Sequence, residues 1–495
     1  MPQLVNFFKA DEGLNSNIHP LLRSILLLLV LLSASIALTF LIVSKGWVFG
    51  VILLSIIVGL PLAWICFNNP LHALVASIIL SYLIFVVRRV SGVYDLPTGT
   101  VSDAILVIGV LGVIFRKSSV SEPIKNPISI AFFISIAYLM IQIANPNAFN
   151  IEAWLNLAFR GIIVKISVFV LSLHAFRTKT DIKNFTIICL VFALIAALYG
   201  MYQELVGLPE FELTWVMSDP VRYKLFYING QLRKWSILGE VSSFGVIMAF
   251  SAITTIILAL GPYKSYKRVL LVVSAICMLI GMSYSGTRTA YVMVPVGIAF
   301  YIMLTIISKR TMVFSVIAVV IGTGLMFGPF YGGTLSRIRT AFQPSNDPSM
   351  QVREANRDLI QPYMHSHPMG GGVGTTSNAG KKYYPGHYLS GFPPDSGYML
   401  TVLETGYIGL AITCWLYFVT LLVGVRNFFR TRDPVIKNYY AAYMAAFFAI
   451  TIGNIAQNAV SYPPADIINI CILVLMFRLK TIDDNSISTD NETIH

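Results

Sequence analysis

Long apolar runs separated by short polar connections make up most of the chain. Each run is long enough to cross a hydrocarbon core of about 30 Å as an α-helix, the form that satisfies its own backbone polar groups within lipid. The pattern predicts an all-α polytopic transmembrane helical bundle of about 12–14 helices. The expected spans are at about 21–43, 47–67, 70–87, 101–115, 127–144, 154–176, 182–206, 236–260, 267–283, 288–307, 311–330, 396–424, 438–458 and 463–479.

The distribution of Lys and Arg predicts an orientation, because these residues are retained on the cytoplasmic side of the membrane. With the N-terminus inside, five short basic connections lie in the cytoplasm and the two long polar segments lie outside. The organisation expected is a cytoplasmic segment 1–20, N-terminal transmembrane helices 21–206, an extracytoplasmic loop 207–235, central helices 236–330, a large extracytoplasmic loop 331–395 containing short helices, C-terminal helices 396–479 and a disordered cytoplasmic tail 480–495.

Composition agrees with a membrane protein, since 56% of the residues are hydrophobic and only 12% are charged. The formal charge of +12 arises largely from the short basic connections, so it does not indicate a nucleic-acid partner. The five cysteines lie in or at the ends of apolar runs, without the spacing of a disulfide framework or a metal site. Glu210 and Glu212 in "LPEFE" are interpreted as a solvated loop, and the sequence predicts neither a metal site nor a cofactor.

Ionisable residues within the apolar runs are candidates for function, since each costs roughly 2.5–3.5 kcal/mol at the centre of a membrane helix. They are Arg160 and Lys165, Glu240, Arg288 in "SYSGTRTAYVMVPVG", and Glu404 in "YMLTVLETGYIG". Snorkelling to the interface accounts for Lys165. It accounts less well for Arg288, because this arginine is expected on the outer side, where the positive-inside preference does not act.

The 331–395 segment collects further polar groups. "MQVREANRDLIQPYM" predicts a short helix with Arg353 and Arg357 on one face, which is either a surface helix or a basic face for an anionic ligand. His367 opens "HPMGGGVG", a glycine-rich stretch that lacks the lysine and preceding strand of a nucleotide P-loop. His387 follows further along the same segment.

Three stretches carry a resemblance to a known family. "SYSGTRTAYVMVPVG", "HPMGGGVG" and "DSGYMLTVLETGYIGL" resemble, in order and spacing, motifs of the O-antigen ligase and polymerase family over about residues 150–460. The resemblance implies a GT-C-type glycosyltransferase in the bacterial inner membrane that acts outside the cytoplasm on glycan linked to undecaprenyl diphosphate. It would polymerise repeat units or ligate the glycan to a glycan or lipid acceptor, with polysaccharide assembly proteins as further candidate partners.

The resemblance also implies site residues. Arg288 matches the arginine at the family's helix start, Arg233 in "QLRKWSILGE" matches a loop arginine, and Arg353 resembles the arginine that begins the helix before the His-Pro stretch. Where the ligases have a histidine before the Glu-x-Gly stretch, this chain has Asp395. That difference leaves ligase and polymerase both open.

The chemistry of these residue types fits the implied reaction. A guanidinium group can meet diphosphate with two parallel hydrogen bonds and stabilise it as it departs. The attacking sugar hydroxyl needs a base, for which Asp395 is the first candidate and His387 the second. Arg160, His367 and Glu404 are secondary candidates.

Two other classes of protein would also use a polytopic bundle with polar outer loops. A transporter or flippase of lipid-linked glycan would carry intramembrane charges, but such proteins usually contain repeated halves, and no repeat is evident here. A noncatalytic scaffold of an assembly complex would leave the outer arginines unexplained.

Overall fold

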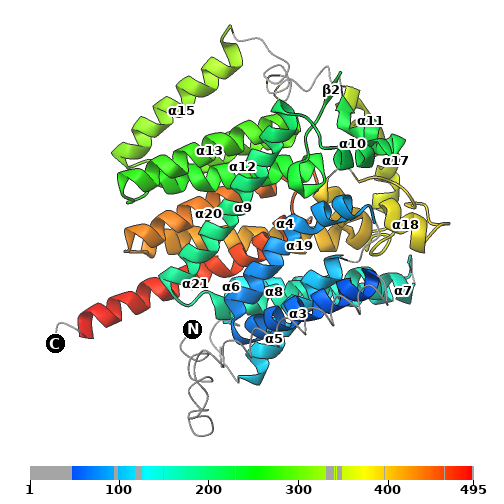
Figure 1. Cartoon of the computed structure of the whole chain (residues 1–495), viewed down its shortest axis with the longest axis horizontal. Coiled ribbons are helices and arrows are strands. Elements are labelled where there is room, and N and C mark those ends of the chain that lie inside the picture. Colours follow the sequence, from blue (N-terminus) through cyan, green and yellow to red (C-terminus); the bar gives the residue numbers. More distant parts are fainter. Residues whose placement is uncertain are drawn as a thin grey trace, which may run out of the picture. The chain divides into compact units, whose positions relative to one another are not determined.

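The protein is described here by a computed structural model that covers residues 47–93, 98–116, 125–148, 150–228, 230–329, 339, 342, 348–394, 396–461 and 463–492 (Figure 1). The chain divides into two units, residues 1–65 and 66–495. The described part of the first unit is the beginning of helix α3 (Trp47–Asn68). The predicted segment 1–20 and the predicted span 21–43 lie outside the described residues.

Ten helical stretches of the described residues are long and apolar enough to cross a membrane. They are α4 (Pro70–Ser91), α6 (Pro127–Ile141) with the 3-10 turn η2 (Gln142–Ala144), α7 (Ile151–Ala153) with the π-helical turn η3 (Trp154–Phe159) and α8 (Arg160–Ala175), α9 (Lys179–Leu205), α12 (Val241–Ala259), α13 (Ser265–Ser285), α14 (Arg288–Thr305), α15 (Lys309–Phe327), α19 (Gly397–Arg430) and α20 (Pro434–Gly453). The end of α3 and α5 (Thr98–Phe115) are shorter apolar helices, and α21 (Ala465–Glu492) is the last helix. The prediction of an all-α polytopic membrane protein is confirmed.

Several helices begin at an Asn-Pro or Asp-Pro pair. The side chain of the first residue accepts a hydrogen bond from a backbone N–H of the first turn, and the proline occupies a position where no backbone donor is needed. These caps fix the helix starts close to where the hydropathy predicts them. Among the membrane helices they are Asn69-Pro70 at α4, Asn126-Pro127 at α6 and Asp433-Pro434 at α20.

Helix α12 forms the centre of the bundle. It packs against α9, α13, α14 and α20, and 83% of the residues in its apolar stretch are buried. Close approach to α9 and α13 depends on small residues, because a Cβ at Gly281 would lie 3.3 Å from the ring of the buried Phe244 and 3.2 Å from the Cα of Ala197. The start of α12 is therefore held rigidly by its neighbours.

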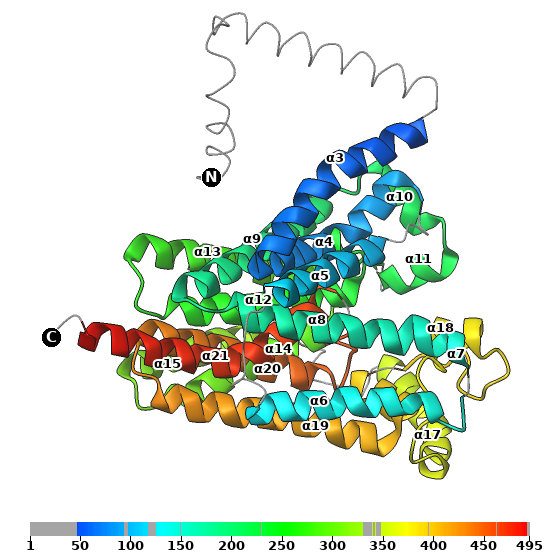
Figure 2. The same ribbon diagram turned by 90° about the horizontal axis from the view of Figure 1, so that it is seen from below.

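Side-chain contacts between the loops that join the helices lie at two ends of the second unit. At one end Asn147 Nδ2 donates to Gly370 O at 2.9 Å, and at the other Lys179 forms a 2.6 Å ion pair with Asp433. Helices α7, α17 (Pro348–Ser366) and α18 (Ser377–Tyr383) lie at one end, and α21 ends at the other (Figure 2). Each of these contacts joins connections that the alternating threading assigns to the same side of the membrane.

Two segments contain more structure than the sequence indicates. The 207–235 loop folds into α10 (Glu210–Met217), α11 (Pro220–Phe226) and the antiparallel strands β1 (Tyr227–Ile228) and β2 (Gln231–Leu232). Helix α21 continues to Glu492, although a disordered tail is expected from residue 480. The continuation is anchored by the buried Asp483, which accepts hydrogen bonds from the backbone N–H groups of Arg432 and Asp433.

Candidate functional site

The turn between α13 and α14 is fixed on the start of α12. Helix α13 ends at Gly286, whose φ of 61° is left-handed, and Arg288 is the first residue of α14. Thr287 Oγ1 donates to the carbonyl oxygen of Val241 at 3.1 Å. A Cβ at Gly245 would lie 2.6 Å from both Ser285 Oγ and Thr287 Cβ, so α12 needs glycine where the turn crosses it. The half-buried Arg288 is thus presented from a rigid backbone.

Arg233 contacts this same turn. Its Nε donates to Ser285 O at 2.8 Å and its Nη2 to Thr287 Oγ1 at 3.2 Å. The next residue, Lys234, donates its backbone N–H to Tyr284 O at 3.0 Å. The structure therefore brings together the regions of two predicted diphosphate ligands, Arg233 and Arg288. It gives two of the guanidinium donors of Arg233 to the protein's own turn, which points to a positioning role for this arginine.

Glu240 lies beside the turn at the N-cap position of α12. Its Oε2 accepts a 2.6 Å hydrogen bond from Ser243, and the positive charge of Arg233 attracts it. Burial raises the pKa of the Glu240 carboxyl group, while Ser243 and Arg233 act in the opposite direction. In the sequence, Glu240 stands out only as an ionisable residue in an apolar run, with no role indicated. Its proximity to Arg233 becomes visible only when the loop is folded.

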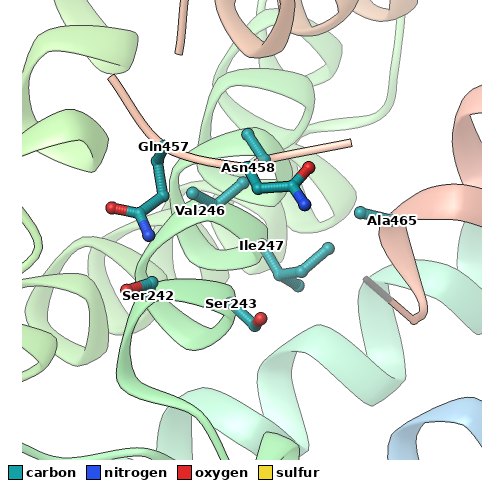
Figure 3. Close-up of a pocket in the computed structure, with 8 residues that line it drawn as sticks. Ser242, Ser243, Val246, Ile247, Gln457, Asn458 and Ala465 are labelled. Carbon is teal, nitrogen blue, oxygen red and sulfur yellow. The ribbon is translucent and has the colours of Figure 1, made fainter. Parts of the chain in front are cut away.

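A pocket opens at the same helix start. Ser242, Ser243, Val246 and Ile247 contribute to it from α12, and Gln457, Asn458 and Ala459 from the segment after α20, with Ala465 at the start of α21 (Figure 3). Gly397, the first residue of α19, donates its N–H to Asn454 O at 3.1 Å, and Asn454 Oδ1 accepts from the N–H of Ala459. The pocket segment is thereby tied to the start of α19.

Asp395 lies outside the described residues, but it directly precedes Ser396 at the start of α19. The N-cap of α19 is Ser396, whose side chain accepts a 3.0 Å hydrogen bond from the backbone N–H of Met399. Ser396 therefore supplies the side-chain cap of α19. The side chain of Arg353, on α17, also lies outside the described residues.

The glycine-rich stretch after α17 docks on a break in α19. Gly406 has φ 72° and ψ −175° within the helix, and the loop lies against it. A Cβ at Gly406 would overlap Pro368 O, and one at Gly370 would lie 2.5 Å from the backbone nitrogen of Gly406. Three backbone hydrogen bonds join the loop to the break: Gly371 N to Leu403 O, Gly372 N to Glu404 O and Tyr407 N to Pro368 O. Two stretches that the sequence analysis treated separately are one structural unit.

Glu404 serves this unit as a hydrogen-bond acceptor. Its Oε1 accepts from Thr376 Oγ1 at 2.7 Å, and backbone N–H groups of Gly374 and Thr376 also donate to the carboxylate. These bonds fold the glycine-rich loop around the side chain. The intramembrane carboxylate is accounted for by an anchoring role.

His387 and His367 flank Tyr363 of α17. The ring of His367 stacks on Tyr363 at 4.0 Å, and Tyr363 Oη lies 3.4 Å from His387 Nε2. His387 Nδ1 accepts the N–H of Leu389 at 3.1 Å, so the neutral ring carries its proton on Nε2. Burial first, and then the nearby His367, lower the pKa of His387. This arrangement makes Nε2 of the neutral His387 ring a hydrogen-bond donor.

Two asparagines that sequence analysis missed hold the glycine-rich loop from another side. The buried Asn145 Nδ2 donates to Met369 O and Gly370 O, and Asn147 Nδ2 donates to Gly370 O. Asn150 Nδ2 donates to Tyr383 O at 3.0 Å. The sequence signal is the motif "NPNAFN" directly after an apolar run, where three amides fall within six residues.

A buried ion pair supports the loop that carries Arg233, and it corrects the interpretation of Glu212 as solvated. Arg89 Nη2 lies 3.5 Å from Glu212 Oε1 and donates to Ser236 O at 3.0 Å, with both charged side chains almost fully buried. Gln203 bridges the two segments, donating to Glu212 and accepting the N–H of Ser236. Burial raises the pKa of Glu212, and Arg89 acts against this shift. The pair fixes residues 236–237, next to Arg233.

Arg160 has a different setting. Arg160 directly follows the π-helical turn η3, and its Nε forms a 2.6 Å ion pair with Asp103 of α5. The contact links α5 and α8 and favours a structural role for Arg160. Among the described residues, no group of three His, Cys, Asp or Glu side chains is arranged to hold a metal ion.

The described contacts thus form two groups. The first is the start of α12 and α14, where Arg233, Arg288, Glu240 and the pocket lie together. The second is the glycine-rich loop with Glu404, His367 and His387. A helix N-terminus carries partial positive charge, so the start of α14, where Arg233 holds the turn that presents Arg288, is suited to an anion.

The sequence model of the O-Antigen ligase family matches residues 273–414. The match begins in α13, ends in α19, and includes the Arg288 turn, the glycine-rich loop and the break at Gly406. The predicted resemblance to the O-antigen ligase and polymerase family is confirmed. Among curated proteins, none matches the chain.

Proposed function

We propose that this protein transfers glycan from undecaprenyl diphosphate to a glycan or lipid acceptor, on the extracytoplasmic side of the bacterial inner membrane. The family match supports the broader activity, that of a membrane glycosyltransferase of the O-antigen ligase or polymerase type. The alternating distribution of basic connections supports the orientation. Both ligation and polymerisation remain within the proposal.

One observation carries the choice of a diphosphate-linked donor. Arg288 stands at the first residue of α14, within the family match, on a turn that Arg233 and α12 hold in place. A rigidly presented guanidinium at a helix N-terminus combines directed hydrogen bonds with the helix dipole. In the proposal, Arg288 binds the diphosphate and stabilises its charge as the glycosidic phosphate bond breaks.

The other residues have supporting roles. Arg233 positions the turn, and Arg353 contributes positive charge from α17. Asp395 accepts the proton of the attacking hydroxyl group, because it immediately precedes the start of α19, which is tied to the pocket segment. The arginines supply the positive charge that the reaction requires, so the proposed mechanism uses no metal ion and no cofactor.

The test is reconstitution of the purified protein with its lipid-linked repeat unit and measurement of glycan transfer. Arg288→Lys keeps the charge but loses the forked geometry, and should reduce the transfer rate roughly 10²-fold or more while the protein accumulates normally. Arg426→Lys, at an exposed position near the end of α19, is the matched control and should remain active. Full activity of Arg288→Lys would contradict diphosphate binding by this residue.

A further inference from the structure

The pocket at the start of α12 contains a buried acceptor that lacks a partner. Within the described part of the chain, Asn458 Oδ1 is buried without a hydrogen bond. Such an atom loses its water on folding and gains nothing in return, which is unfavourable unless a ligand or water supplies a donor. Asn458 lines the pocket together with Gln457, Ser242 and Ser243 (Figure 3).

The lining groups indicate the class of ligand. Two hydroxyl groups and two carboxamides are neutral hydrogen-bonding partners, and the nearby carboxylate of Glu240 makes the pocket unfavourable for an anion. The remaining lining residues, Val246 and Ile247 among them, offer apolar contact. The pocket has room for about one water-sized group rather than for a whole ring, and a single sugar hydroxyl group is a neutral group of that size.

The position of the pocket relates it to the donor site. Ser243, which lines the pocket, is bonded to Glu240, and Glu240 is attracted by Arg233. Arg233 in turn holds the turn that precedes Arg288. A group in the pocket would therefore lie on the same helix start that supports the proposed diphosphate site.

We propose that this pocket is a subsite for a sugar hydroxyl group of the lipid-linked glycan, which donates its hydrogen bond to Asn458 Oδ1 beside Ser243. Glu240 fixes the orientation of Ser243 and acts as a positioning residue. The inference rests on the proposed function, because it requires a lipid-linked glycan as substrate.

The test measures the binding of two lipids by the full-length protein in nanodiscs. The first is undecaprenyl diphosphate, and the second is the glycan-bearing lipid isolated from a strain of the source bacterium that lacks this protein. Wild type should bind the glycan-bearing lipid about tenfold more tightly. Asn458→Leu should lose most of that preference, keep its affinity for undecaprenyl diphosphate, and melt no lower than wild type, since it removes an unsatisfied buried group.

The matched control is Asn469→Leu. Asn469 lies on α21, and within the described residues both polar atoms of its amide are buried without a partner, but it does not line the pocket. This variant should keep the preference for the glycan-bearing lipid. An equal loss in both variants would overturn the inference, because it would show a general effect of substitution.

The remaining outcomes separate the inference from the proposed function. If Asn458→Leu keeps the full preference, the pocket holds only water and the inference is wrong, while the proposed function stands. If wild type binds neither lipid, the proposed function fails. Ser243→Ala is the second variant if Asn458→Leu does not fold, and it must show the same selective loss.

Discussion

Replacing Gly406 with alanine should detach the glycine-rich loop from α19. Its φ of 72° with ψ of −175° lies in a backbone region that is essentially restricted to glycine, and this conformation costs another residue roughly 1–3 kcal/mol. The added Cβ would also overlap Pro368 O and lie 2.5 Å from the carbonyl carbon of Met369. Both neighbours are backbone atoms, so the overlap is relieved only by movement of the loop.

The magnitude follows from what that movement breaks. Three backbone hydrogen bonds join the loop to the break, each worth about 0.5–1.5 kcal/mol. Together with the strain, we expect a loss of roughly 3–7 kcal/mol, a large fraction of the stability of a typical domain.

Thermal unfolding of the purified protein measures this loss. Gly322→Ala is the control, because Gly322 of α15 has no atom within 4 Å of an added Cβ and no positive φ. Gly406→Ala should melt well below that control and lose glycan transfer. Equal melting temperatures for the two variants would refute the reasoning.

Three further predictions address the base, the histidine and the topology. Asp395→Asn should insert normally and lose about 10²–10⁴-fold in glycan transfer, since asparagine cannot accept the proton, and a rate within a few fold of wild type removes Asp395 from the mechanism. His387 has a lowered pKa, so the folded protein binds fewer protons than the unfolded chain between that pKa and about 6.5. The contribution of His387 to stability is therefore complete above this pH window and falls as the pH decreases through it. His387→Gln should reduce the fall in melting temperature with decreasing pH, and an unchanged dependence of melting temperature on pH would argue against the lowered pKa. In a cysteine-free background, cysteine introduced by Asn378→Cys at an exposed position should react with an impermeant maleimide in spheroplasts. Cysteine introduced by Ser265→Cys, also at an exposed position, should react only after lysis. The reverse result would invert the proposed orientation.

The helices were largely predictable from the sequence because hydropathy and caps act locally. The expected span 127–144 corresponds to α6 with η2, and the Asn126-Pro127 pair fixes its start. The boundary between α13 and α14 was equally readable, since "SYSGT" supplies the glycine that a helix end requires. Motif order also predicted the resemblance that the family model supports over residues 273–414.

Contacts between distant segments were not readable. Glu212 appeared solvated because its partner Arg89 is far away in the sequence and ends an apolar run, where an arginine is ordinarily explained by snorkelling. The docking of the loop at Gly370 on Gly406 depends on backbone geometry at both positions, and neither stretch reveals the other. Arg233 was selected as a ligand for diphosphate, but its hydrogen bonds to Ser285 and Thr287 required the folded turn to be seen.

The break at Gly406 also bears on how the substrate of the proposed reaction would enter. It lies about 14 Å along α19 from the helix start, where backbone groups that lost their partners would face a medium without water. The loop residues 368–372 supply those partners, so moving the loop away would leave these backbone groups unpaired. If the arginines bind the lipid-linked donor as proposed, that donor must reach them by a route that leaves these contacts intact.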